Sequence, residues 1–117
     1  MNLATLRAAR AELSLEFEGE TLRFTIAPNT ITPAYRAQLR QRIADKEAAG
    51  SSTDALIGEA IVQNVADLVT GWDLKEGDEP IPVSREAIES LPEDLVAEIW
   101  QVIDRFLSKR TATEPSA

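Results

Sequence analysis

Residues 12–18 alternate strictly between apolar and polar side chains and residues 21–26 do so again, which is typical of β-strands with one buried face. The apolar positions form two sets on either side of a short break: Leu13, Leu15 and Phe17, then Leu22, Phe24 and Ile26. Residues 19–20 are Gly-Glu and fit a two-residue turn of type II′, in which glycine comes first. That turn would pair Phe17 with Leu22 across the two strands. The pattern therefore predicts an antiparallel β-hairpin.

Two longer helices are predicted after the hairpin. Thr32 and Pro33 suit a helix start, because threonine caps free N–H groups and proline loses no hydrogen bond at the first helical position. This helix is expected to run to about residue 47, with one apolar residue per turn. The second helix is expected to begin near residue 53. Its apolar face continues for about five turns and consists of Ile57, Ile61, Val65, Leu68, Val69 and Trp72.

An acidic loop with two prolines, residues 74–82, is predicted to fold the chain back. Ser84 then suits the start of a short helix, and Ser90 with Glu93 has capping-box spacing for the last helix. Residues 109–117 are polar and are expected to form a disordered tail. The last helix has a wider apolar stripe than one neighbouring helix needs: Leu91, Leu95, Val96, Ile99, Trp100, Val102, Ile103, Phe106 and Leu107.

These elements predict an α+β fold, in which an N-terminal antiparallel β-hairpin is followed by three to four α-helices. A chain of 117 residues is expected to form one domain, here over residues 1–108. No apolar run reaches the ~18 residues of a membrane span, and the N-terminus lacks the apolar core of a secretory signal. The chain has no cysteine, so disulfides are excluded and a reducing cytosol is the expected compartment.

Charge is distributed unevenly along the chain. The formal net charge is −8, with +1 on residues 1–47 and −9 on residues 48–117. The acidic half would repel nucleic acid and anionic membranes, and it would favour a basic protein partner. Arg36 and Arg40 form a basic patch on the first long helix. A solvated helix face is the simpler interpretation of this patch, and docking to the acidic half of a sister subunit is the functional one.

Few residues in the chain suit catalysis. Histidine is absent as well as cysteine, which removes the commonest general base and the commonest metal ligands. Carboxylates are plentiful, but Lys75 breaks the calcium-loop spacing that Asp73 would begin. No catalytic, metal or cofactor site is therefore predicted, and an enzyme would need chemistry based on carboxylates alone.

The excess apolar width of the last helix predicts a surface for a protein partner. The expected contact residues are Trp100, Ile103 and Phe106 of the last helix, with Asp73, Asp78 and Glu79 of the acidic region nearby. Trp72 has the simpler interpretation of a core residue.

Three features, in this order and spacing, resemble the tail assembly chaperones of long-tailed bacteriophages. The first is the hairpin, residues 15–22, which leaves through an Ala-Pro-Asn-Thr-Ile-Thr-Pro segment, residues 27–33. The second is the sequence Trp-Asp-Leu at residues 72–74, which closes a long apolar helix. The third is an acidic Gly/Pro loop, residues 77–82, followed by Ile-Glu-Ser-Leu-Pro at residues 88–92.

This resemblance implies a non-enzymatic, self-associating protein that binds the long helical tape-measure protein and keeps it soluble. It also implies recruitment of tail-tube protein subunits in the host cytoplasm, and absence from the mature virion. Binding to nucleic acid or to a membrane is not expected. Two alternatives remain open: another structural protein of the same phage module, and a small acidic regulatory or antitoxin-like adaptor that blocks a basic protein partner.

Overall fold

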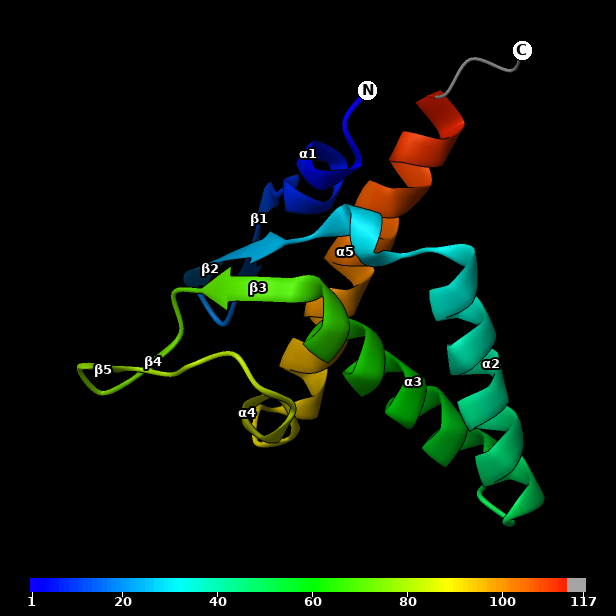
Figure 1. Cartoon of the computed structure of the whole chain (residues 1–117). Helices are drawn as coiled ribbons and strands as arrows, with labels where there is room; N and C mark the ends of the chain where they lie inside the picture. Colours follow the sequence, from blue (N-terminus) through cyan, green and yellow to red (C-terminus); the bar gives the residue numbers. More distant parts are fainter. Residues whose placement is uncertain (114–117) are drawn as a thin grey trace.

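The computed structural model describes residues 1–113, and Figure 1 shows a mixed α+β architecture. The predicted fold class is confirmed, because two antiparallel strands come first and most of the helices follow. In chain order the elements are α1 (Leu3–Ala8), β1 (Ala11–Phe17), β2 (Glu20–Ile26), the 3-10 turn η1 (Pro28–Thr30), α2 (Pro33–Ala48), α3 (Thr53–Leu68), β3 (Val69–Trp72), β4 (Lys75–Glu76), β5 (Glu79–Pro80), α4 (Arg85–Glu89) and α5 (Glu93–Thr113).

The β1–β2 hairpin turns at Glu18 and Gly19, one residue earlier than predicted. Both residues have positive φ angles, 51° and 83°, which is the signature of a type I′ turn with glycine second. Leu15 rather than Phe17 pairs with Leu22, so the predicted register is wrong by two residues. Because side chains alternate with period two, this shift keeps the apolar residues of both strands on one face.

The second long helix ends earlier than predicted, and the chain then forms a third strand. α3 stops at Leu68, and β3 pairs antiparallel with β2, so the sheet order is β1-β2-β3. The prediction of a helix through Trp72 is wrong because this segment completes its backbone hydrogen bonds on the sheet. The β-branched residues Val69 and Thr70 favour that conformation.

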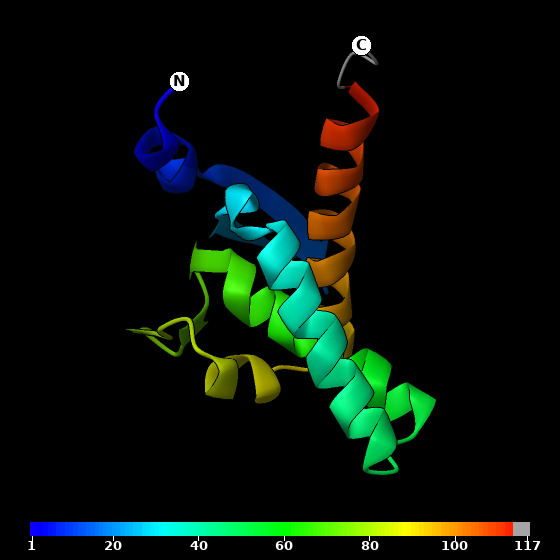
Figure 2. The same cartoon turned by 45° about the vertical axis from the view of Figure 1, so that its right-hand side comes forward.

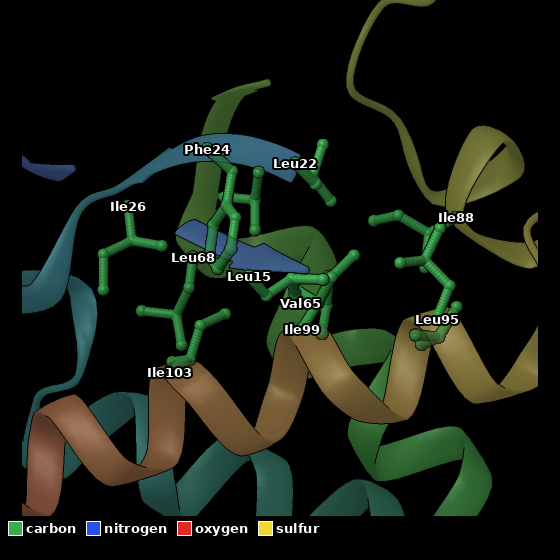
Figure 3. Close-up of a cluster of buried hydrophobic side chains, with 12 residues drawn as sticks. Leu15, Leu22, Phe24, Ile26, Val65, Leu68, Ile88, Leu95, Ile99 and Ile103 are labelled. Carbon is green, nitrogen blue, oxygen red and sulfur yellow. The ribbon is translucent and has the colours of Figure 1, made fainter. Parts of the chain in front are cut away.

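The hydrophobic core lies between the sheet and the helices α3 and α5. Figure 3 shows Phe24 and Ile26 of β2 pointing toward Ile99 and Ile103 of α5, with Leu68 of α3 beside them. Each of these five side chains is at most 1% exposed. Full burial of such a side chain contributes roughly 1.5–3 kcal/mol, so this cluster is a major source of stability.

α2 stands apart from this core, and none of its residues is buried. Tyr35 joins it to α3, because the tyrosine hydroxyl donates to Asn64 Oδ1 at 2.9 Å. The radius of gyration is 15.5 Å, whereas a compact domain of this length has about 13.4 Å. Figure 1 shows several parts that project from the core: the ends of α2 and α3 that meet at their connecting turn, the β4–β5 hairpin and the last turns of α5.

Two predicted helix caps are confirmed and one is wrong. The hydroxyl oxygens of Thr32 and Ser84 each accept a hydrogen bond from the backbone N–H three residues later, at 3.1 and 3.0 Å. Ser90 was expected to form a capping box with Glu93. Its hydroxyl instead donates to the carbonyl oxygen of Ala87 at 2.6 Å, so it closes the end of α4.

The last helix is longer than predicted. α5 continues through Thr113, so residues 109–113 of the expected polar tail belong to the helix. Residues 114–117 of that tail lie outside the described part of the chain.

Candidate partner-binding surfaces

Trp100 is half-buried on α5 and lines a groove of about 220 Å³ between α2, α3 and α5. We call this the Trp100 groove. A larger hollow of about 450 Å³ shares Ile31, Arg36 and Leu107 with it, so the two form one depression along α2. The lining residues of the Trp100 groove are Ile31, Tyr35, Arg36, Leu39, Asn64, Trp100, Asp104, Leu107 and Ser108.

Ile103 and Phe106 do not join Trp100 in a single exposed strip. Ile103 is 0% exposed, so it belongs to the core and its side chain is not available to a partner in this fold. Phe106 is half-buried and lies about 120° from Trp100 around the helix axis, given 3.6 residues per turn. The apolar stripe of α5 is wide because the helix packs on β1 and on α3.

Asp73 has a structural role at the end of β3. Its Oδ1 accepts a hydrogen bond from the backbone N–H of Arg23 at 2.9 Å. Its own N–H donates to the carbonyl oxygen of Arg23 at 3.0 Å. These two bonds extend the pairing of β2 with β3 by one residue, so Asp73 holds the sheet together.

Asp78 and Glu79 are exposed in the small hairpin formed by β4 and β5, which we call the acidic hairpin (residues 75–80). Trp72 anchors the chain after this hairpin, because its Nε1–H donates to the carbonyl oxygen of Ile81 at 2.6 Å. Figures 1 and 2 place the acidic hairpin on the opposite side of the molecule from α2. The predicted contact residues are therefore divided between two separate surfaces.

A second groove, which the sequence did not reveal, lies where the start of α5 packs against α3. We call it the Gly58 groove; its volume is about 310 Å³. A Cβ atom placed on Gly58 would meet no atom within 4 Å, and the neighbouring Ile57 is 54% exposed. The only sequence signal is a glycine beside an isoleucine within a helix. The groove is lined by Gly58, Ile61, Val62, Glu89, Leu91, Glu93, Val96 and Ala97.

Glu59 joins three helices through ion pairs. Its carboxylate lies 2.6 Å from Arg85 of α4 and 2.8 Å from Lys46 of α2. The hydrogen bond from Arg85, followed by that from Lys46, lowers the pKa of Glu59 below its ordinary value. Lys46 therefore forms its ion pair within its own chain. The two ion pairs of Glu59 together hold α2 and α4 against α3.

Tyr35 titrates at higher pH than an ordinary tyrosine. Partial burial of the half-buried side chain is the main cause that raises the pKa of its hydroxyl, and the nearby Asp67 carboxylate raises it further. The hydroxyl therefore remains a neutral donor to Asn64 across the physiological range.

The described residues contain neither a candidate metal cluster nor a candidate membrane span. In that part of the chain no three carboxylates are grouped so that they could hold a metal ion. None of the helices in the same range is both long enough and apolar enough to cross a membrane.

No protein-family model, curated protein or solved structure matches this chain at a significant level.

Proposed function

We propose that this protein is a tail assembly chaperone of long-tailed bacteriophages, which binds the tape-measure protein and recruits tail-tube subunits. The observation that carries the proposal is the Trp100 groove, where a half-buried indole lies between α2 and α5. Its apolar neighbours in the lining are Ile31, Tyr35, Leu39 and Leu107, and the rest of the lining is polar or charged. Buried aromatic anchors dominate the binding energy of protein interfaces, and grooves between helices accept amphipathic helices. The long helical tape-measure protein is a partner of that kind.

The order of elements also supports the proposal. The features that resemble this family correspond to the β1–β2 hairpin, the start of α2, the acidic hairpin and the turn into α5. One feature differs, because the Trp-Asp-Leu sequence at residues 72–74 closes the strand β3 rather than a helix. In this proposal the protein acts by binding alone, works in the host cytoplasm and leaves before the virion is complete.

Co-expression with the tape-measure protein from the same genome tests the proposal. The amount of tape-measure protein in the soluble fraction is expected to rise when the wild-type chain is present. Ser108→Phe places a ring over the Trp100 groove from an exposed position, so it is expected to abolish the effect while the fold survives. Gln101→Ala, on the exposed side of the same helix, is the matched control and is expected to behave as wild type. An insoluble tape-measure protein in the presence of the wild-type chain refutes the proposal.

The acidic hairpin favours a second candidate, an adaptor that blocks a basic protein partner. All of its residues are exposed, and Glu76, Asp78 and Glu79 place three carboxylates on one projecting turn. Such a surface steers a basic partner toward it and weakens with salt. Asp78→Lys with Glu79→Lys separates the two candidates. If the protein is an adaptor, this variant should lose its binding to the basic protein partner. If the protein is a tail assembly chaperone, the variant should still keep the tape-measure protein soluble.

A further inference from the structure

Among the residues that the structure describes, the exposed large apolar side chains lie in two places. They are Met1, Leu3 and Leu6 in the N-terminal segment, and Ile57 in α3, which comes directly before Gly58 in the sequence. The exposed fractions are 58% for Leu3, 39% for Leu6 and 54% for Ile57. No residue of α1 is buried, so the leucines of this helix are not packed into the core of their own chain. Contact between the N-terminal segment and the region of Ile57 and the Gly58 groove would therefore bury exposed apolar surface on both sides.

The two places also have opposite charge. Leu6 and Arg7 follow Leu3 by three and four residues, so both lie beside Leu3 on one side of α1. The Gly58 groove is apolar along its length, and Glu89 and Glu93 are the two acidic residues that line it. Glu89 already pairs with Arg85 at 2.8 Å, which leaves Glu93, exposed on the first turn of α5, as the better partner for an arginine. A face with two leucines and one arginine therefore matches an apolar groove with a carboxylate at its edge.

The volume of the groove fits this occupant. A cavity of about 150 Å³ holds a benzene ring, and the Gly58 groove measures about 310 Å³. It thus has room for about two leucine-sized side chains. Gly58 leaves the space open, because a Cβ at this position would meet no atom within 4 Å.

The N-terminal segment cannot reach the groove of its own chain. α1 ends at Ala8 and β1 begins at Ala11, so only a short link separates the helix from the sheet. The side-chain amide of Asn29 also donates to the carbonyl oxygen of Leu6 at 2.8 Å. Figures 1 and 2 place α1 and α4, which borders the groove, at opposite ends of the molecule. The occupant must therefore come from another molecule.

We propose that α1 of one copy binds in the Gly58 groove of the next copy, through Leu3 and Leu6 in the groove and an ion pair between Arg7 and Glu93. The contact joins two different surfaces, so it is heterologous and leaves one free α1 and one free groove on every pair. Repetition of such a contact gives a ring if the rotation closes and an open helical assembly if it does not. This inference does not rest on the proposed function, which concerns the Trp100 groove.

Two complementary variants test the proposal. Leu3→Glu with Leu6→Glu removes the apolar face of α1, and both positions are exposed, so the core is untouched. Gly58→Phe fills the groove, and Gly58→Ala is the matched control that leaves most of it open. Circular dichroism and thermal unfolding check that each variant folds, and sedimentation velocity measures association from about 1 μM to about 1 mM.

The wild-type chain and Gly58→Ala are expected to form assemblies larger than dimers as concentration rises. Each blocked variant alone is expected to associate at least about tenfold more weakly, which corresponds to 1.4 kcal/mol. An equal mixture of the two is expected to form 1:1 heterodimers and nothing larger, because only one functional contact remains. Arg7→Glu is expected to weaken self-association, and the combination of Arg7→Glu with Glu93→Arg is expected to restore it. Both positions are exposed, so these variants still test the proposal if Gly58→Phe does not fold.

Three results would overturn the proposal: a wild-type chain that stays monomeric up to about 1 mM, a folded blocked variant that associates as strongly as wild type, or a mixture that forms no heterodimer. Ser108→Phe, which blocks only the Trp100 groove, is expected to self-associate normally. Failure of self-association is therefore distinguishable from failure of the chaperone proposal.

Discussion

Glu18 has a backbone conformation that is unfavourable for a glutamate, and its replacement by asparagine is expected to stabilise the protein. Its φ angle of 51° lies in the left-handed region, which costs an ordinary L-residue roughly 1–2 kcal/mol. Asparagine is much better tolerated there and is strongly preferred before glycine in a type I′ turn. We expect Glu18→Asn to raise the free energy of unfolding by about 1 kcal/mol. With a urea slope of about 2 kcal/mol per molar, the unfolding midpoint would rise by about 0.5 M.

Glu20→Asn is the matched control, because it makes the same chemical and charge change in the first residue of β2. Asparagine is disfavoured in strands, so this variant is expected to be equal to or less stable than wild type in the same urea titration. A turn at residues 19–20 would reverse the order of the two variants, since asparagine suits the position after glycine in that turn. If Glu20→Asn is the stabilising change and Glu18→Asn is not, the observed register is refuted.

Three further changes have defined outcomes in urea unfolding. Gly58→Ala is expected to stabilise α3 by about 1 kcal/mol, because the new Cβ is unobstructed and glycine is a poor helix former; an unchanged midpoint would contradict this. Asp73→Ala is expected to cost about 1 kcal/mol through the lost bond to the Arg23 N–H. Asp73→Asn keeps the acceptor oxygen and should stay near wild type; equal losses in both variants would argue against this role. The pKa of Glu59 is lowered in the fold from an ordinary value of 4.5, so its stabilisation is fully present above that value and is lost as pH falls through the lower, folded pKa. Glu59→Gln should therefore destabilise the protein more at about pH 7 than at about pH 3, and a pH-independent difference would count against the ion-pair network.

The faces of the hairpin could be predicted from the sequence, but its register could not. Alternation places Leu15 and Leu22 on the buried face whichever turn is used, because a shift of two residues preserves the faces. The choice of turn depends on whether Gly19 comes first or second in it, and both arrangements have known turn types. The cost of a left-handed Glu18 is small enough for the rest of the sheet to offset it.

The third strand was missed because its pairing is non-local. Leu68, Val69 and Trp72 have the three- and four-residue spacing of a helix, and only the backbone of β2, far away in sequence, shows that residues 69–72 form a strand instead. Among the candidate contact residues, Trp100 does line a groove whereas Ile103 is fully buried. The width of an apolar stripe does not tell whether its neighbours belong to the same chain or to a partner.

Hydrogen exchange of the complex with the tape-measure protein tests the central claim most directly. If the Trp100 groove binds this partner, backbone amides of residues 33–48 and 100–108 should exchange more slowly in the complex than in the free chain. Residues 75–80, in the exposed acidic hairpin, should exchange equally in both. A complex that protects only residues 75–80, or a tape-measure protein that causes no protection anywhere, would contradict the account.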